Sequence, residues 1–237
     1  IENIDYQDAH LPFVKKLSIA GKILFNFDAQ KKLEKIIDDF RPDVAHLHNI
    51  YHQLSPSIIW TLKKHNIPTV MTLHDYKIVS PNYNLFVGGK VWNHNSGWRC
   101  IVDASVKDSF VKSLVCALER WLHNFLGSYE KIDVFLSPSR FLIKKFEDLG
   151  FKREITFLPN SLSAFEESKD SQATTREENT FLFFGRLSQE KGVDTLIEAL
   201  ALLPEENKLL IAGDGPDRKR LEKLTQEKKM VSRVTFF

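Results

Sequence analysis

Residues 183–194 read Phe183-Phe184-Gly185-Arg186-Leu187-Ser188-Gln189-Glu190-Lys191-Gly192-Val193-Asp194, and this run gives the strongest indication of the fold class. Residues 180–184 are typical of a buried strand, and the Lys-Gly pair stands directly before a predicted helix over 193–203. In an open parallel sheet, ligands bind beyond the carboxyl ends of the strands, where a helix N-terminus also attracts anions. The run therefore predicts a parallel sheet with an anion site at its edge.

Two cations in this run, Arg186 and Lys191, give the anion site its chemistry. A guanidinium can form a bidentate hydrogen bond with two phosphate oxygens, and an ammonium supplies a movable point charge. Two fixed cations can replace a metal in stabilising a departing diphosphate. The alternative is that both side chains are simply solvated in a polar loop.

The βα rhythm continues toward the C-terminus, with a strand over 208–212, a helix from Asp217 and a strand at 234–237. The turn Gly213-Asp214-Gly215-Pro216 follows the first of these strands, so it should lie beside the loop of Arg186. Glycines there let the backbone approach a ligand closely. An unliganded tight turn is the other reading of Gly213 and Gly215.

The N-terminal part shows the same alternation of helices and strands with short connections, which is typical of a parallel sheet covered on both faces. Ser55 and Pro56 are expected to open a helix, and Ser139 to cap another that ends at Gly150. The remaining elements are a helix that Asp28 is expected to cap and strands over 44–47, 68–73, 132–136 and 154–158.

Residues 74–100 are rich in Asn, Gly and aromatic residues, which predicts a long functional loop above the sheet. A helix should follow over 106–126 and stop at Gly127. Its aromatic and leucine stripe is expected to face the core, with a membrane-facing role as the alternative. The stripe consists of Phe110, Leu114, Leu118, Trp121 and Phe125.

Histidines follow two of these strands. His74 and its neighbour Asp75 should stand at the rim of the sheet, where an imidazole could hydrogen-bond a sugar hydroxyl or a developing charge. The i, i+2 spacing of His46 and His48 puts both on one side of their strand. His46 and His48 are expected to be ordinary cleft-lining or core residues, with a zinc-binding pair as the alternative. Asn160, after Pro159, is either a turn residue or a ligand contact.

The composition of the chain limits the classes of function that it can have. The chain has 237 residues and a net charge of +2, so no overall basic field predicts nucleic-acid binding. Cys100 and Cys116 lack zinc-type spacing and are expected to be inert. No stretch reaches the roughly 18 to 20 apolar residues that span a bilayer.

The polar, aperiodic residues 161–179 predict a linker between a first domain over 1–160 and the first part of a second domain over 180–237. The chain begins without Met and stops within a predicted strand. Both domains are therefore expected to be incomplete, in an internal fragment of a longer chain.

Several motifs occur together in the order of glycosyltransferase family 4. They are Arg41-Pro42-Asp43-Val44-Ala45-His46-Leu47-His48, Thr72-Leu73-His74-Asp75-Tyr76, Ser137-Pro138-Ser139, Leu158-Pro159-Asn160-Ser161, Gly185 through Gly192, Leu196-Ile197-Glu198-Ala199-Leu200 and Ala212-Gly213-Asp214-Gly215-Pro216. The sequence resembles that family over nearly its whole length, which implies the GT-B fold, two Rossmann-like parallel-sheet domains facing a cleft.

The resemblance also implies roles for individual residues. Arg186 and Lys191 would hold the donor diphosphate with Gly185 beside them, the turn from Gly213 to Gly215 would approach the nucleotide, and His74 would contact the sugar or assist its transfer. His48, Asp75, Ser137 and Asn160 are candidate cleft-lining residues. The family's glycine-rich first loop and its later carboxylate pair are absent from this sequence, so the fragment alone is expected to bind donor poorly and not to turn over.

The expected function is transfer of a sugar from a nucleoside diphosphate sugar to a hydroxyl, with retention and without a cofactor or metal ion. A surface glycan or lipid-linked saccharide is the expected acceptor, and the cytoplasm, with peripheral contact at the inner face of the membrane, the expected location. Two rivals remain open. One is a GT-B sugar-nucleotide epimerase, and the other is a non-catalytic GT-B binding or scaffold subunit.

Overall fold

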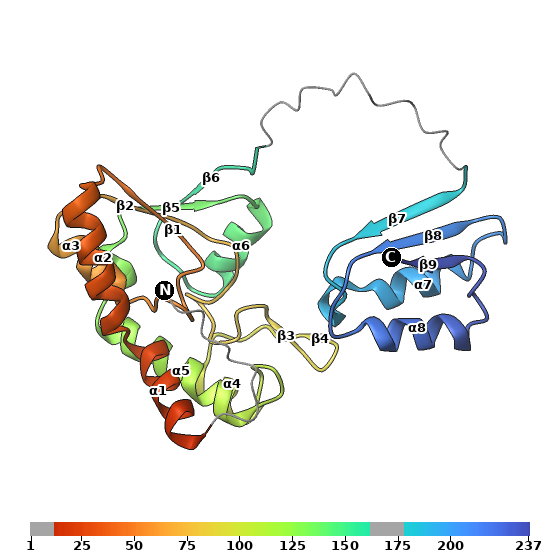
Figure 1. Ribbon diagram of the computed structural model, residues 1–237, viewed down its shortest axis with the longest axis horizontal. Coiled ribbons are helices and arrows are strands. Elements are labelled where there is room, and N and C mark those ends of the chain that lie inside the picture. The colour runs from red at the N-terminus through yellow and green to blue at the C-terminus, as the bar shows by residue number, and fades with distance from the viewer. Residues whose placement is uncertain (1–11, 162–177) are drawn as a thin grey trace. The chain divides into compact units, whose positions relative to one another are not determined.

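The computed structural model describes residues 12–161 and 178–237. The chain divides into two compact units, Ile1–Ser161 and Leu162–Phe237, each built around its own sheet (Figure 1). The predicted linker, 161–179, lies almost wholly outside the described residues.

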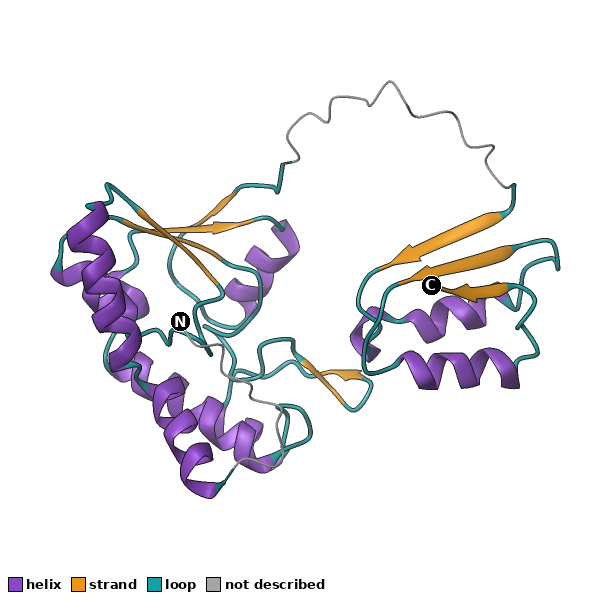
Figure 2. Cartoon of the chain, in the orientation of Figure 1, coloured by secondary structure: helices purple, strands orange, loops and turns teal. Residues whose placement is uncertain are grey.

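The first unit contains a four-stranded parallel sheet in the order β1-β2-β5-β6 (Figure 2). The strands are β1 (Ala45–His48), β2 (Thr69–Thr72), β5 (Val134–Ser137) and β6 (Ile155–Phe157). The register pairs His48 with Thr72, and Thr72 with Leu136. This confirms the predicted parallel α/β architecture, and it brings the carboxyl ends of β1 and β2 side by side.

The helices around this sheet are α1 (Phe13–Leu24), α2 (Phe27–Phe40), α3 (Ile58–Lys64) and α6 (Arg140–Asp148). The cap at Ser139 is confirmed, since its hydroxyl accepts from the amide of Leu142 at 3.3 Å. The predicted start of α2 is wrong. Asn26, not Asp28, caps it by accepting from the amide of Ala29 at 3.0 Å.

The predicted start of α3 is also wrong. Ser55 has a φ of +58°, so its backbone turns the chain in the left-handed region instead of opening a helix. The helix begins only at Ile58, after Ser57. The hydroxyls of both serines lie 2.7 Å apart and accept from the amide of Asn26, so they fix the start of α2 instead.

Residues 74–126 differ most from expectation. The segment 74–100 contains a hairpin, β3 (Phe86–Val87) with β4 (Lys90–Val91), and the start of α4 (Gly97–Val102). The predicted helix over 106–126 is α5 (Phe110–Phe125), which Ser109 caps, and a turn separates it from α4. Gly127 follows as predicted, with a φ of +61°.

The predicted buried stripe of α5 is wrong. Phe110 is 58% exposed and Phe125 is 89% exposed, whereas the buried face includes two polar residues, Glu119 and His123. The physical reason is that both polar side chains have partners inside the unit. Glu119 meets a buried lysine, and His123 is hydrogen-bonded through both ring nitrogens, so burial of these polar groups is compensated.

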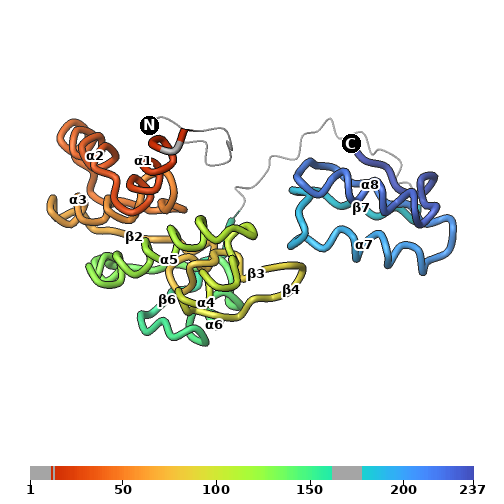
Figure 3. Tube along the Cα trace, turned by 90° about the horizontal axis from the view of Figure 1, so that it is seen from below, coloured from red at the N-terminus to blue at the C-terminus, as the bar shows by residue number. Residues whose placement is uncertain are grey.

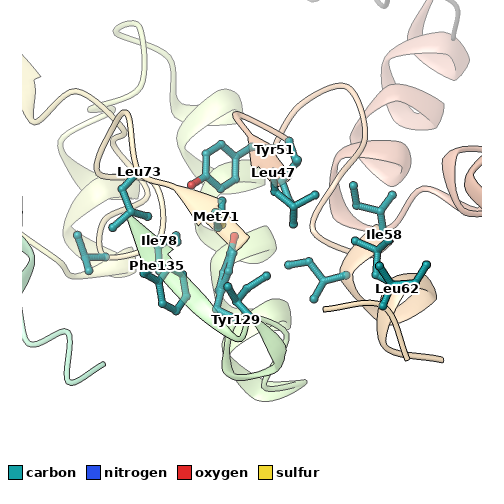
Figure 4. Packing of buried hydrophobic residues seen from close by; sticks show 14 of the residues in the cluster. Leu47, Tyr51, Ile58, Leu62, Met71, Leu73, Ile78, Tyr129 and Phe135 are labelled. Atoms are coloured by element: carbon teal, nitrogen blue, oxygen red, sulfur yellow. The ribbon is translucent and has the colours of Figure 1, made fainter. Parts of the chain in front are cut away.

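The core of the first unit joins three strands to α2, α3 and α6 (Figure 4). Met71 and Leu73 come from β2 and its end, and Phe135 comes from β5; all three are almost fully buried. Two tyrosines, Tyr51 and Tyr129, belong to the same cluster. Burial first, and nearby carboxylates second, raise the pKa of both phenols well above the ordinary range.

The second unit is a three-stranded parallel sheet in the order β7-β8-β9, formed by β7 (Thr180–Phe184), β8 (Lys208–Ala212) and β9 (Val234–Phe236). Helices α7 (Val193–Leu200) and α8 (Arg218–Glu227) cover one face of this sheet (Figures 1 and 3). The prediction of β7 as a buried strand is wrong. It lies at the sheet edge, and Leu182 and Phe184 are 64% and 80% exposed, because both helices pack on the other face.

A chain of hydrogen bonds through His123 predicts a pH dependence of stability. The indole N–H of Trp60 donates to the hydroxyl of Ser128, which lies 2.9 Å from His123 Nδ1, while His123 Nε2 lies 2.8 Å from the carbonyl of Leu24. The neutral ring fits this chain, since Nε2–H donates and Nδ1 accepts. Burial lowers the pKa of His123, as it does for His52, whose pKa falls to about 4, and for His46 and His74.

We expect the free energy of unfolding to fall as the pH drops below about 6.5, the unfolded pKa of histidine. The unfolded chain then binds protons that these folded histidines resist. Asp75 opposes this partly, because burial raises its pKa to about 6 and acid favours its folded form. Urea unfolding between pH 5 and 8 measures the slope. The variant His123→Gln keeps a side chain that can donate and accept hydrogen bonds but does not titrate, so the free energy of unfolding should depend less steeply on pH. An unchanged slope would show that His123 does not cause the pH dependence.

Candidate functional site

The predicted anion site lies on the connection from β7 to α7. Gly185 follows β7 with a φ of +147°, and a short 3₁₀ turn, Gln189–Lys191, leads to Gly192 and the start of α7. Arg186 and Lys191 are both exposed. Neither side chain forms an ion pair or hydrogen bond with residues 12–161 or 178–237. Within that part of the chain, both cations are therefore available to a ligand.

The glycine turn lies directly beside this connection, as the sequence predicts. The amide of Gly185 donates to the carbonyl of Ala212 at 3.0 Å, and the amide of Leu187 donates to the carbonyl of Asp214 at 2.9 Å. The amide of Asp217 returns a bond to the carbonyl of Leu187 at 3.1 Å. These three bonds hold the loop of Arg186 against the start of α8.

The two glycines of the turn have a packing role that the sequence did not indicate. A Cβ on Gly213 would overlap the carbonyl oxygen of Gly185, and one on Gly215 would overlap that of Leu187. Gly213 also has a φ of +146°, a conformation that strains other residues. Glycine is therefore needed here for the two loops to touch, whether or not a nucleotide approaches.

Replacing Gly213 with alanine should destabilise the second unit by about 1–3 kcal/mol from backbone strain, with the overlap at Gly185 adding to this. Gly192→Ala is the matched control, because Gly192 has a φ of +64° but open space around its Cβ position. Thermal unfolding of the two variants separates the cost of backbone strain from the cost of the overlap with Gly185. Equal losses for both would show that the contact between the loops carries no weight.

In the first unit the structure brings three histidines together at the ends of β1 and β2. His48 Nδ1 lies 2.8 Å from His74 Nε2, and the rings of His46 and His48 are 4.1 Å apart. The prediction that His46 and His48 share one side of β1 is confirmed. All three side chains are classed as exposed. Partial loss of solvent around the His74 ring first, and the neighbouring imidazoles second, lower the pKa of His74, so its neutral form is favoured.

Asp75 lies at the start of the segment that follows β2. Its carboxylate accepts from the amide of Lys77 at 3.0 Å, and the side chain is partly buried. Burial raises its pKa to about 6, against the lowering effect of the Lys77 amide and charge. A carboxyl with that pKa can exchange a proton near neutral pH.

The other two candidates of the first unit differ from each other. Ser137 is fully buried, and its hydroxyl donates to the carbonyl of Ser139 at 3.0 Å. It therefore shapes the turn before α6 and does not line a surface of this unit, contrary to expectation. Asn160 is exposed after Pro159, at the end of the first unit.

A buried ion pair, which sequence reasoning missed, lies beneath the His74-Asp75 segment. Lys77 Nζ and Glu119 Oε2 are 2.5 Å apart, and both side chains are 1% exposed. No local pattern marks either residue: Lys77 sits in a polar segment, and Glu119 falls between the apolar positions of α5. The contact is a close ionic one, without well-angled hydrogen bonds.

Over 12–161 and 178–237, no three His, Cys, Asp or Glu side chains gather in a way that could hold a metal ion. No helix in the same ranges combines the length and hydropathy needed to cross a bilayer.

The two parallel-sheet units, each with its candidate residues beyond the carboxyl ends of strands, define the GT-B class of α/β protein. Comparison with known proteins gives the family. A model described as "Glycosyltransferase Family 4" matches residues 3–163, and a model described as "Glycosyl transferases group 1" matches residues 164–237. The chain belongs to glycosyltransferase family 4.

Two curated relatives match the chain over most of its length. The chain is 26% identical over 81% of its length to an uncharacterised 42.6 kDa protein in the cps region of Klebsiella pneumoniae, covering 45% of that protein. It is 24% identical over 98% of its length to the α-monoglucosyldiacylglycerol synthase of Streptococcus pneumoniae, covering 50% of it. The chain spans half or less of the length of these curated relatives.

Solved structures support the fold. Anabaena HepE in complex with UDP and glucose resembles the chain with a TM-score of 0.55 at 20% identity, over 88% of this chain and 50% of that one. A mutant of the Staphylococcus aureus protein TarM gives a TM-score of 0.54 at 15% identity, over 88% of this chain and 35% of that one. At these identities the similarity concerns the fold.

Proposed function

We propose that the protein to which this chain belongs transfers a sugar from a nucleoside diphosphate sugar to a hydroxyl of a glycan or lipid-linked acceptor, with retention of configuration. One observation carries the proposal: the exposed cations Arg186 and Lys191 stand, without partners in the described chain, on the loop that is hydrogen-bonded to the Gly213 turn. Family membership supports it, as does the UDP in the structure of HepE.

Two parts of the proposed reaction, departure of the diphosphate and contact with the sugar, would use groups that this chain offers. As the glycosidic bond to the diphosphate breaks, negative charge grows on the leaving phosphate, and fixed cations stabilise that charge more than they stabilise the bound substrate. Arg186 and Lys191 would supply this stabilisation without a metal ion. His74, favoured in its neutral form, would hydrogen-bond the transferred sugar or its developing charge.

A panel of nucleotide sugars, offered to the full-length protein with and without glycan and lipid-linked acceptors, tests the proposal. Release of nucleoside diphosphate together with a new glycoside is the expected result. Interconversion of the sugar nucleotide without an acceptor would identify an epimerase. Tight binding without any product would identify a binding or scaffold subunit, and either result would overturn the proposed transfer.

The proposed acceptor and location also rest on the first unit. Helix α5 packs against α1 and against α4, and the three helices carry exposed apolar side chains, among them Val14, Leu17, Val102, Phe110 and Val111. The exposed lysines Lys15, Lys16 and Lys112 stand beside some of these side chains in the sequence. Such a combination suits peripheral contact with an anionic membrane surface. In a cytoplasmic enzyme, this contact would bring the first unit to a lipid-linked acceptor.

Cosedimentation with vesicles of phosphatidylcholine and phosphatidylglycerol measures this contact. Changing Phe110 and Val111 to serine should weaken binding by at least about tenfold, because each buried side chain contributes ~1.5–3 kcal/mol. Phe141→Ser, at a side chain 70% exposed on α6, is the control. Equal loss in the control, or none in the test variant, would contradict membrane contact through α5.

A further inference from the structure

The buried ion pair of Lys77 and Glu119 joins two distant parts of the first unit. Lys77 belongs to the segment that follows β2, and Glu119 lies on the buried face of α5. Both side chains are 1% exposed, and their charged atoms are 2.5 Å apart. Taking two charges out of water costs several kcal/mol per ion, and apolar residues of similar volume commonly fill such a site equally well. Stability alone therefore does not account for the pair.

Beyond stability, the pair holds the segment that carries Lys77 in a fixed position. Apolar side chains can slide past one another, whereas the close ionic contact fixes where the Lys77 segment lies relative to α5. The amide of Lys77 donates to the carboxylate of Asp75 at 3.0 Å, so the backbone that carries the buried ammonium also holds Asp75. His74 comes directly before Asp75 and meets His48 at 2.8 Å. A continuous set of contacts thus runs from α5 to the exposed imidazole.

The rest of the segment packs around this anchor. The amide of Tyr76 donates to the carbonyl of Tyr83 at 2.8 Å, and the amide of Ser80 donates to the carbonyl of Tyr76 at 2.8 Å. Residues 77–82 are buried. At the start of the segment His74 is exposed, and Asp75 and Tyr76 are partly buried. Lys77 is therefore placed to transmit the position of α5 to His74 and Asp75, the candidate site residues that directly precede this buried stretch.

We propose that Lys77 and Glu119 are positioning residues, which hold His74 and Asp75 in the orientation needed for sugar transfer. The inference rests on the proposed function only for its kinetic consequence. Its structural content, that the pair fixes the His48–His74 contact, stands independently of any reaction.

The test uses the double variant Lys77→Met/Glu119→Leu in the full-length protein, because single variants leave a buried charge and can fail to fold. Lys64→Met/Glu34→Leu is the matched control; that pair is 3.0 Å apart, but its side chains are 71% and 36% exposed. For the buried double variant we expect kcat to fall at least about tenfold with little change in the KM for donor, since misplacement by about 1 Å can cost ~10²-fold in rate.

A second readout separates the positioning role from the proposed activity. Nitrogen-15 NMR of the imidazoles reports whether His48 and His74 share a proton in the wild type and in the double variant. Loss of that signature in the variant supports positioning even if the wild-type protein transfers no sugar. An unchanged signature and unchanged kcat in a stably folded double variant would overturn the inference.

Discussion

Replacing Arg186 with alanine lowers the turnover of nucleotide sugar in the full-length protein by about 10²–10³-fold, the loss typical when one preorganised donor to a developing charge is removed. The guanidinium is exposed and has no partner among the described residues, so its removal breaks no structural contact there. The effect should therefore appear in kcat, with folding unchanged. Steady-state kinetics of product release, together with circular dichroism, measure both.

The matched control for Arg186→Ala is Lys219→Ala, which removes an exposed cation from α8 in the same unit. Its turnover should equal that of the wild type. Lys191→Ala should resemble Arg186→Ala in direction, because both side chains act on the same anion in the proposed site. Turnover close to wild type in Arg186→Ala would remove this residue from the site.

Replacing Lys77 with methionine destabilises the protein by about 3–5 kcal/mol, because Glu119 then remains as a buried charge without its counterion. The structure gives the carboxylate no well-angled hydrogen bond that could compensate. Adding Glu119→Leu should recover most of this loss, since an apolar pair fills the site at no electrostatic cost. Urea unfolding of the single and double variants measures both quantities.

This thermodynamic cycle separates a buried ion pair from a surface one. Removing Lys64 from its exposed pair with Glu34 should change stability by less than about 1 kcal/mol. A loss of that small size in Lys77→Met would mean that solvent reaches the pair. Failure of the second substitution to restore stability would mean that the apolar residues do not fit the site.

The sequence predicted those features that depend on local chemistry. A serine followed by an amphipathic run marked the cap at Ser139, and Gly127 marked the end of α5. The alternation of short strands and helices was sufficient for the parallel α/β class, because parallel strands need helical crossovers. For the same reason, the loop of Arg186 was correctly expected beside the turn at Gly213.

Features set by partners far along the chain were not predictable. The face of α5 that is buried was misjudged because its polar residues, Glu119 and His123, are compensated by Lys77, Leu24 and Ser128. The predicted start of α3 was wrong for a similar reason, because the hydroxyl of Ser55 accepts a hydrogen bond from the distant amide of Asn26. No hydrophobic period contains that information.

The candidate site shows the same division. The positions of Arg186, Lys191 and His74 followed from strand ends, which sequence can locate. The contact between His48 and His74 depends on the pairing of β1 with β2, and the packing need for Gly213 depends on the loop beside it. Both became visible only in three dimensions.

In the proposed site Arg186 and Lys191 hold the diphosphate of the donor, and calorimetric titration with nucleotides measures that contact. UDP, GDP, ADP and CDP would each be titrated into the full-length wild type and into Arg186→Ala/Lys191→Ala, with the matching nucleosides as controls. We predict that the double variant loses diphosphate affinity by about 10²-fold or more, at ~1.5–3 kcal/mol per charged hydrogen bond, while nucleoside binding is unchanged. Equal diphosphate affinity in wild type and double variant would contradict the claim.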